Sequence, residues 1–256
     1  MITKQLIEIK SHIEIAEDTF EMVLHSTISH ELKPGQFVHI ALNGHMLRRP
    51  VSIANVDTEK ETFTVIFKIF GEGTRELSKS KTGGDYLDVI LPCGTHYPIE
   101  DLNLDHALIV GGGIGVPPLY YLGKKLKEEG GVRVTSVLGF QAKAQVFYEE
   151  KFRQLGDVYI ATNDGSYGQK GFVTDIIGNL NSPPIDYYFS CGPTPMLQAV
   201  TNQLQDQKGY ISLEERMGCG VGTCYACVVP LKADPSKNKK ICKDGPVFYA
   251  NEVILA

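Results

Sequence analysis

Four cysteines near the end of this 256-residue chain constrain its fold more than any other feature. Cys219, Cys224 and Cys227 follow the spacing C-x4-C-x2-C, and Cys242 comes after fourteen intervening residues. This spacing is typical of a plant-type [2Fe-2S] cluster. Glycines beside the cysteines let the backbone fold tightly, so that N–H groups point at the sulfurs. We therefore expect these four cysteines to ligate a [2Fe-2S] cluster.

A zinc knot is the alternative, because four thiolates also suit tetrahedral zinc. Zinc ligands more usually come as two short C-x-x-C-like pairs, so the spacing favours iron and sulfide. The segment from about residue 211 has no helical periodicity and too few apolar residues to fold through burial alone. Either centre would supply the stability that the core of this segment lacks.

Length, composition and charge exclude several classes of protein. The length predicts two full domains of about 150 residues or less each. The composition, with 43% hydrophobic and 21% charged residues, is ordinary for a soluble protein with a packed core. The net charge of −5 comes without a basic block, which argues against nucleic-acid binding. Residues 1–8 reach charge too early for a signal peptide, and the longest uncharged segment, 107–123, is too short to span a bilayer. We expect a cytoplasmic protein that enters no membrane.

Two folding patterns follow one another along the chain. From Gln5 to about Leu91, short β-branched and aromatic runs alternate with turn signals, which indicates a small barrel or sandwich. After about Asp105 the pattern becomes strand, glycine turn and helix, with a helix expected over 146–155, and predicts a parallel α/β sheet. The expected domains are residues 1–102, residues 103–210 and a small tail of 211–256.

Two motifs in the first domain have groups that suit a flavin nucleotide. Arg49, Pro50, Val51 and Ser52 offer a cation to a pyrophosphate and a hydroxyl to a ring nitrogen, separated by a proline-stiffened backbone. Further on, a strand runs into a glycine turn, 71–77, that opens a short helix with N–H groups available to an anion. The alternative is an ordinary strand–turn–helix with Thr74 as its N-cap. Together the two sites favour a flavin.

Two glycine turns in the second domain suit a dinucleotide. The run 111–115 follows a buried-type strand and precedes a helix, but it departs from G-x-G-x-x-G, and the next strand lacks a terminal acid for the ribose. The second turn contains Cys191, Gly192 and Pro193 and follows the strand expected over 186–190. It lies at the carboxyl edge of the sheet, where open α/β sheets bind ligands. A buried structural thiol is the alternative for Cys191. The candidate NAD-binding residues are Gly111, Gly112, Gly113, Gly115, Cys191, Gly192 and Pro193.

In this order, the motifs resemble the electron-transfer subunits of NAD-linked, type B dihydroorotate dehydrogenase, a family within the ferredoxin-reductase superfamily. The resemblance covers essentially the whole chain and includes the runs 164–171, 214–219 and 242–248. It implies a multidomain fold: an antiparallel β-barrel that binds FAD (1–102), an α/β parallel-sheet domain that binds NAD (103–210), and a small C-terminal [2Fe-2S] domain (211–256).

The resemblance also implies roles for single residues. The arginine motif would lie near the flavin and its phosphates, and Cys191 would lie near the nicotinamide as the candidate catalytic residue. The family usually has a glycine-rich loop where this chain reads 92–97, so no role is transferred there, and Cys93 stays unassigned. The expected FAD-binding residues are Arg49, Pro50, Val51, Ser52, Ile66, Phe67, Lys68, Gly73 and Thr74.

Three redox groups in one chain have a chemical reason. A hydride carries two electrons, whereas the cluster passes one at a time. A flavin between them can exchange electrons in pairs with the nicotinamide and singly with the cluster. No motif suggests an organic substrate, and the chain therefore looks like half an enzyme. The resemblance implies an FMN-containing dihydroorotate dehydrogenase catalytic subunit as partner, in a heterotetramer of two of each. Electrons from dihydroorotate would then reach NAD+ in de novo pyrimidine (UMP) biosynthesis.

Two rival functions stay open at this point. One is an NAD(P)H–ferredoxin reductase subunit, or a reductase for an oxygenase or a sulfur-reducing complex. A ferredoxin domain fused to an oxygenase reductase has a longer gap before its last cysteine, which counts against that version. The other is a metal-stabilised interaction protein without activity. Intact Arg49, Ser52, Thr74 and four ordered cysteines argue against it.

Overall fold

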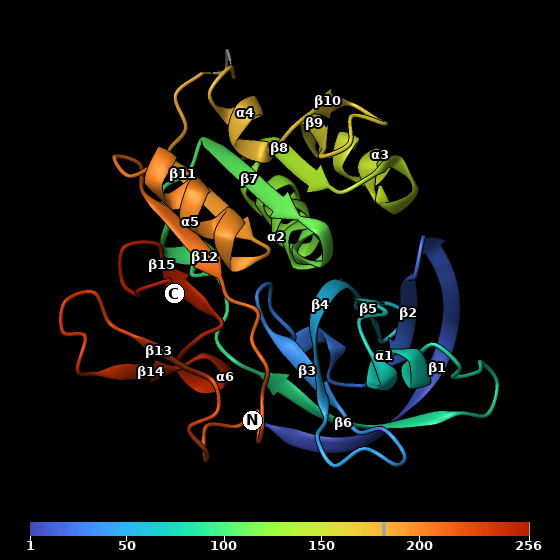
Figure 1. The fold of residues 1–256 in the computed structure, drawn as a ribbon. Helices are drawn as coiled ribbons and strands as arrows, with labels where there is room; N and C mark the ends of the chain where they lie inside the picture. The colour runs from blue at the N-terminus through green and yellow to red at the C-terminus, as the bar shows by residue number, and fades with distance from the viewer. Residues whose placement is uncertain (181–182, 256) are drawn as a thin grey trace.

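A computed structural model describes residues 1–180 and 183–255, which form a barrel, a larger sheet and a C-terminal segment between them (Figure 1). Among these residues, no helix combines the length and the apolar run that crossing a bilayer requires. The predicted combination of an antiparallel barrel, a parallel sheet and a C-terminal iron–sulfur segment is confirmed.

The N-terminal barrel is closed by six antiparallel strand pairs, in the order β1-β2-β5-β4-β3-β6. Closure leaves no free sheet edge and decides between the barrel and the sandwich. The short helix α1 (Glu72–Leu77) follows β5. The strands are β1 (Thr3–Ala16), β2 (Thr19–His25), β3 (Phe37–Ile40), β4 (Arg49–Asp57), β5 (Thr62–Lys68) and β6 (Tyr86–Cys93).

The second sheet has seven strands in the order β10-β9-β8-β7-β11-β12-β15, parallel except where β15 pairs with β12. The strands are β7 (His106–Gly112), β8 (Arg133–Phe140), β9 (Gly156–Thr162), β10 (Gln169–Lys170), β11 (Tyr187–Cys191), β12 (Gly209–Ser212) and β15 (Val247–Tyr249). The helices are α2 (Val116–Gly130), α3 (Glu149–Arg153), α4 (Val173–Ile177) and α5 (Thr194–Gln203).

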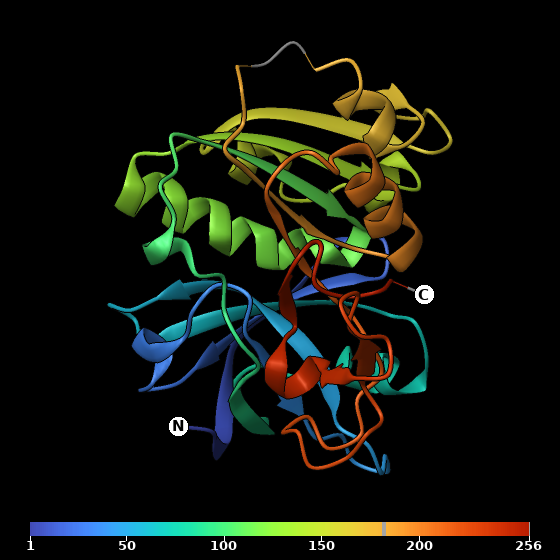
Figure 2. The same cartoon turned by 90° about the vertical axis from the view of Figure 1, so that its left-hand side faces the viewer.

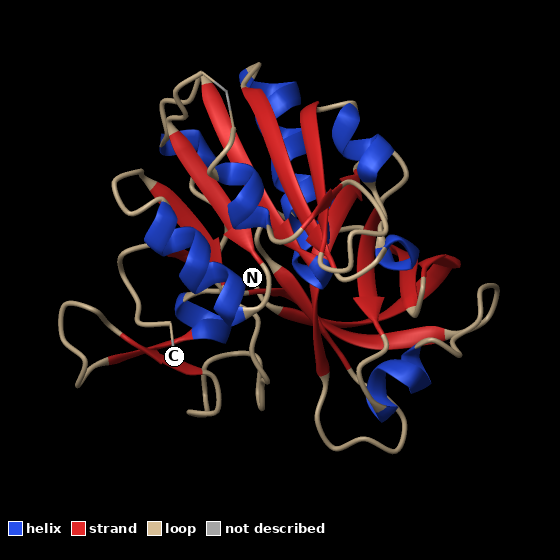
Figure 3. Cartoon of the chain, turned by 45° about the horizontal axis from the view of Figure 1, so that its top comes forward, coloured by secondary structure: helices blue, strands red, loops and turns tan. Residues whose placement is uncertain are grey.

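Helices cover both faces of this sheet (Figure 3). Alternate side chains of β7 face opposite ways, as the pleat requires. Leu108 and Val110 share a core with α4 and α5, whereas Ala107 and Ile109 share one with α2 and α3. This two-sided burial explains why β7 reads as a continuous apolar run in the sequence.

The C-terminal segment leaves the sheet at β12 and returns to it at β15. Between them lie β13 (Val228–Pro230), β14 (Asn238–Lys240) and the single-turn helix α6 (Ile241–Asp244). β12 runs through residue 210, where the sequence places a domain boundary, and Ile211 pairs with Phe248. The segment therefore shares a sheet with the α/β domain, and the division of the chain into three domains stays a prediction.

The same segment also contacts the barrel, as Figure 2 shows where its red ribbon lies against the blue and teal strands. The backbone N–H of Thr95 donates to the Gly245 carbonyl (2.5 Å), and its hydroxyl donates to the Val247 carbonyl (3.4 Å). Thus the stretch 92–97, to which the sequence assigned no role, binds the C-terminal segment. Cys93 is fully buried here, and desolvation raises the pKa of its thiol to about 12.

Phe248→Ala tests whether this segment is an integral part of the fold. The ring is 2% exposed and belongs to a core that joins the barrel, the sheet and the cysteine segment. Its removal should cost about 3–5 kcal/mol of stability, the usual range for a buried Phe. Thermal unfolding of the full chain, followed by circular dichroism, measures the effect. Phe172→Ala is the matched control, because that ring is 63% exposed. Equal melting temperatures for the two variants would contradict the assignment.

Candidate functional site

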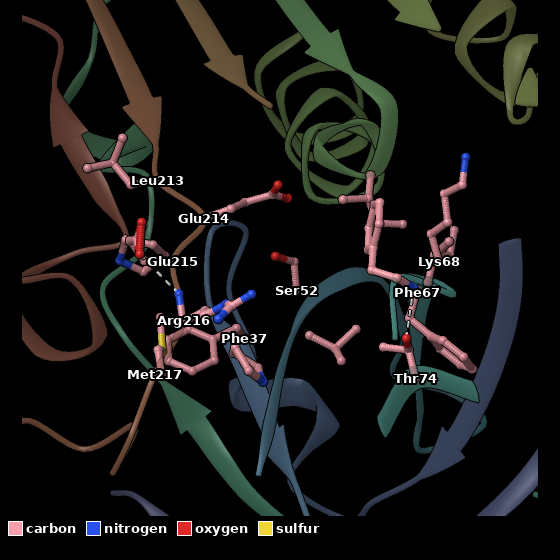
Figure 4. A pocket seen from close by; sticks show the side chains of 16 residues that line it. Phe37, Ser52, Phe67, Lys68, Thr74, Leu213, Glu214, Glu215, Arg216 and Met217 are labelled. Atoms are coloured by element: carbon pink, nitrogen blue, oxygen red, sulfur yellow. Dashed lines mark hydrogen bonds between the residues drawn. The ribbon is translucent and has the colours of Figure 1, made fainter. Parts of the chain in front are cut away.

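A cavity of about 480 Å³ lies where the barrel, the β7–α2 loop and the start of the cysteine segment meet (Figure 4). Seven of the nine expected FAD-binding residues line it: Pro50, Val51, Ser52, Ile66, Phe67, Lys68 and Thr74. The other lining residues, none of which had been expected to bind a cofactor, are Phe37, Phe70, Ile114, Leu213, Glu214, Glu215, Arg216, Met217 and Pro246.

The cavity has the character of a site for a planar, partly apolar ring. Phe37, Ile66 and Met217 form buried parts of its wall, each less than a tenth exposed. Ser52 and Glu214 point toward its middle (Figure 4). Apolar walls with a few convergent polar groups are the usual lining of a cofactor pocket, and the residues therefore fit a flavin.

Arg49 lies beside α1 and directly precedes Pro50, which lines the cavity. A Cβ atom built on Gly73 would overlap the Arg49 guanidinium, so the glycine makes room for it. The guanidinium also contacts Nδ1 of His45 at 3.3 Å. The two expected FAD-binding residues that do not line the cavity, Arg49 and Gly73, are thus in contact with each other.

Thr74 stabilises the turn before α1 from inside the helix. Its Oγ1 accepts hydrogen bonds from the N–H groups of Phe70 (2.9 Å) and Gly71 (3.3 Å). The helix begins at Glu72, with Gly71 at the N-cap position, so Thr74 is its third residue. The alternative in which Thr74 is the N-cap is therefore wrong in position, although the hydroxyl does bond to the turn.

Glu214 is an ionisable residue of the cavity to which the sequence assigned no role, as are Glu215 and Arg216, although it opens the run 214–219 that carries part of the resemblance. Its side chain is exposed at the cavity, which is flanked by the barrel and by the start of the C-terminal segment. Desolvation raises the pKa of this carboxyl to about 7. The Glu214-Glu215 doublet gives no sign of which side chain enters the cavity. The available signal was the location of Glu214 two residues after β12, at the carboxyl edge of the sheet.

The two glycine turns expected to bind NAD meet beside this cavity. β7 and β11 are parallel neighbours, with Gly111 opposite Cys191. A Cβ atom on Gly115 would overlap the backbone carbonyl of Cys191. Ile114, in the first turn, lines the cavity. A dinucleotide on these turns would therefore reach the flavin candidate site.

Cys191 is enclosed by the protein, with 0% of its surface exposed. Desolvation, with the charge of Glu214 as a smaller cause, raises the pKa of its thiol well above the usual value. The residue is a neutral thiol that does not itself line the cavity. Its burial agrees with the structural-thiol alternative, and its role at the nicotinamide stays a prediction.

The cysteine loop directs backbone donors at sulfur, as the glycine pattern predicts. Thr223 and Cys224 donate their N–H groups to Sγ of Cys219 at 3.2 and 3.4 Å. Gly222 donates its N–H to Sγ of Cys242 at 3.2 Å. Burial opposes ionisation of Cys219, but hydrogen bonds to its sulfur outweigh it and lower its pKa to about 5.

The four thiols interact as two pairs. Cys219 contacts Cys224, and Cys242 contacts Cys227; burial first, and then this contact, raise the pKa of Cys242 to about 12. A [2Fe-2S] cluster takes two protein ligands on each iron, so this pairing fits it. Over residues 1–180 and 183–255, no three His, Cys, Asp or Glu side chains are gathered to hold one metal ion. The loop starts beside the cavity, because Met217 lines it.

Comparison with known sequences places these features in a family. Residues 214–254 match the iron–sulfur cluster binding domain of dihydroorotate dehydrogenase B. The chain is 51% identical to the dihydroorotate dehydrogenase B (NAD+) electron transfer subunit of Shouchella clausii, over 94% of this chain and 95% of that protein. It is 50% identical to the corresponding subunit of Bacillus cereus strain G9842, with all of both chains covered.

Solved structures agree with the fold. The NADH-dependent reduced ferredoxin–NADP oxidoreductase superposes with a TM-score of 0.87 at 34% identity, covering 98% of this chain and 90% of that one. The ferredoxin reductase of carbazole 1,9a-dioxygenase has a TM-score of 0.70 at 19% identity, over 80% and 66% of the two chains, and supports the fold alone. By sequence identity over its whole length, the chain belongs to the family of electron transfer subunits of NAD+-linked dihydroorotate dehydrogenase B.

Proposed function

We propose that this chain passes electrons from dihydroorotate, oxidised in a partner subunit, through a [2Fe-2S] cluster and FAD to NAD+. The observation that carries the proposal is a single cavity bordered by three regions. Ser52 and Phe67 come from the barrel, Ile114 from the expected NAD turn, and Met217 from the start of the cysteine loop. A flavin in this cavity would have the nicotinamide on one side and the cluster on the other.

Residue roles follow from these positions. Arg49 and Thr74 would bind the FAD phosphates, and Ser52 would hydrogen-bond the ring. The turns 111–115 and 191–193 would bind NAD. Bound flavin supplies the conversion between two-electron and one-electron transfer. The cluster ligands would be Cys219, Cys224, Cys227 and Cys242.

The partner is a catalytic subunit of the same complex. We infer that it contains FMN and that the complex has two copies of each chain, as the resemblance implies. A cytoplasmic location goes with this proposal, because thiols persist in a reducing compartment and none of the six cysteines is in a disulfide. The alternative of a ferredoxin-linked reductase has weaker support. This chain is 34% identical to the ferredoxin–NADP oxidoreductase and 50% identical to the dihydroorotate dehydrogenase subunit of Bacillus cereus.

Glu214 has a place in this chemistry because the cluster carries electrons without protons. NAD+ gains a hydride, which is two electrons and one proton, so the proton must enter at the flavin from this chain or from water. The carboxyl of Glu214 points into the cavity and has a pKa raised to about 7. Such a pKa lets it both hold and release a proton near neutral pH. We infer that Glu214 delivers this proton.

Glu214→Gln should slow NAD+ reduction by about 100-fold or more, because an amide cannot supply the proton. In the wild type, the rate should fall as the pH rises through about 7, where Glu214 ionises; the variant should lose this dependence. Steady-state rates of the complex over a range of pH give both results. Glu59→Gln, at an exposed turn of the barrel, is the matched control. An unchanged pH profile in Glu214→Gln would contradict the role.

The same substitution has a separate effect on stability. The folded state binds a proton at Glu214 more tightly than the unfolded chain, whose glutamate has a pKa near 4.5. Stability of the wild type should therefore fall as the pH rises from about 4.5 through 7. Glu214→Gln should melt at a higher temperature than the wild type at pH above 7, and the gain should vanish at low pH.

Arg49→Ala should weaken FAD binding. It removes a charge-assisted contact to phosphate worth about 1.5–3 kcal/mol, or about tenfold to a hundredfold in affinity. Fluorescence titration of the deflavinated chain with FAD measures the loss. Arg133→Ala is the control, since Arg133 pairs with Asp157 on the surface of the other domain. Equal affinities for the two variants would remove Arg49 from the site.

Cys224→Ser tests the order of electron transfer and the proposed function together. The variant should lose the iron–sulfur absorbance, yet NADH should still reduce its flavin at the wild-type rate. In complex with the catalytic subunit, dihydroorotate should no longer reduce NAD+. Cys93→Ala, which alters a buried thiol outside the ligand set, should keep the cluster. Full dihydroorotate-dependent NADH formation by the Cys224→Ser complex would overturn the proposed route.

A further inference from the structure

His39 lies buried between the flavin cavity and the cysteine loop, where backbone groups of Arg48 and Cys219 approach its ring without a hydrogen bond of normal geometry. Its side chain is 1% exposed. Over the described part of the chain, neither ring nitrogen has a hydrogen bond of normal geometry. An unpaired polar group in the interior costs about 1–3 kcal/mol. An apolar residue would fill this place in the barrel more cheaply, so packing alone does not explain the imidazole.

The strand that carries His39 has two faces with different neighbours. Val38 and Ile40 point into the core of the barrel. Phe37 and His39 lie on the opposite face, since side chains alternate along a strand. The two rings meet edge to face, with centroids 6.5 Å apart and planes at 80°. Because Phe37 lines the cavity, the outer face of β3 runs from the flavin candidate site to His39.

The other side of His39 faces the cysteine loop. A Cβ atom on Gly220 would overlap Nδ1 of the imidazole, so the loop backbone rests directly on the ring. Gly220 has a φ of +70°, a conformation that favours glycine. The backbone of Cys219 also approaches the ring. The residue next to a predicted cluster ligand is therefore in contact with a side chain of the barrel.

We propose that His39 is the positioning residue that fixes the cluster-binding loop against the flavin end of β3, and so sets the rate of electron transfer between the cluster and FAD. The proposal rests on the assignment of the four cysteines as cluster ligands under the proposed function. Each transfer moves one electron between flavin and cluster, and the imidazole gains and loses none. Its part is geometric: it holds Cys219 in place through the loop backbone.

Position matters here because electron transfer slows as the distance between the flavin and the cluster grows; bond-forming reactions can lose about 100-fold in rate for a misplacement of about 1 Å, and electron transfer is less sensitive than these. Replacing the imidazole with a methyl group leaves a space under Gly220, into which the loop can move. The barrel core is on the other face of β3 and is not opened by this change. The flavin site should therefore survive while the cluster loop shifts.

The test uses the full chain, loaded with both cofactors and mixed with NADH without oxygen in a stopped-flow instrument. In His39→Ala, flavin reduction should stay within about twofold of the wild type, and the following cluster reduction should slow about tenfold or more. The EPR spectrum of the reduced cluster should also change, because its surroundings differ. His39→Asn, which keeps a planar group beneath Gly220, should recover part of the rate. His30→Ala, at an exposed histidine, is the matched control.

A double-mutant cycle with Gly220→Ala examines the contact itself. The added methyl group should displace the loop from the ring and slow cluster reduction. In the double variant with His39→Ala, the ring is absent, so the second change should cost less than it does alone. Strictly additive effects of the two substitutions on the rate would overturn the proposed contact.

Two further outcomes would also overturn the proposal. One is a wild-type cluster rate and EPR spectrum in His39→Ala. The other is loss of FAD together with the cluster in both His39 variants, which would show that the ring serves only the packing of the barrel. Because NADH is the reductant, these measurements do not depend on dihydroorotate. Failure of the proposed function would appear separately, as a wild-type complex that does not oxidise dihydroorotate.

Discussion

The pairing of β15 with β12 is the constraint on which the arrangement of the redox sites depends. It joins the last part of the chain to the edge of the NAD-type sheet, with Ile211 opposite Phe248. The cysteine loop begins a few residues after β12, and its last cysteine precedes β15 by a few residues, so both ends of the loop are fixed. Hydrogen bonds from Thr95 fix the same segment to the barrel. A segment too small to fold alone thus gains its position from two larger neighbours.

This double attachment also creates the cavity. Leu213 and Met217 come from the chain that leaves β12, and they close a side of the flavin candidate site that the barrel leaves open. The elements that position the cluster are therefore the elements that wall the flavin site. Leu213 and Met217 precede the cysteines, none of which lines the cavity, so the loop beyond Cys219 can shift while this wall stays in place.

Local patterns in the sequence predict the architecture well, and contacts between distant segments account for what they miss. The β-branched runs and the glycine turns predicted the barrel and the parallel sheet, because periodicity and turn chemistry are local. The helix expected over 146–155 is shorter, since Tyr148 has a φ of 64° and bonds Glu21 of the barrel. Tertiary contact overrides helical propensity there.

The same reasoning applies to the candidate site. Most of the expected FAD-binding residues lie at the cavity because a motif of neighbouring residues places them on one strand and one turn. Phe37 and His39 belong to no such motif, and the run 214–219 that contains Glu214 carried no assigned role. Phe37 and His39 are ordinary alternating residues of β3, and only the folding of the C-terminal segment over that strand gives them neighbours that matter. Their roles depend on residues about 180 positions away in the sequence, which no local pattern can show.

Under the proposed function, an iron–sulfur cluster between the catalytic subunit and FAD separates electrons from protons, and this separation shapes what the chain must contain. Protons released when a substrate is oxidised in the partner stay there, while electrons cross through the cluster. The chain therefore needs its own route for a proton to the site where a hydride forms, and this route has to be shielded enough to hold a proton near neutral pH. The carboxyl of Glu214, at the wall of the cavity beside the barrel, meets that need. The cavity keeps it in reach of water, and the surrounding protein raises its pKa.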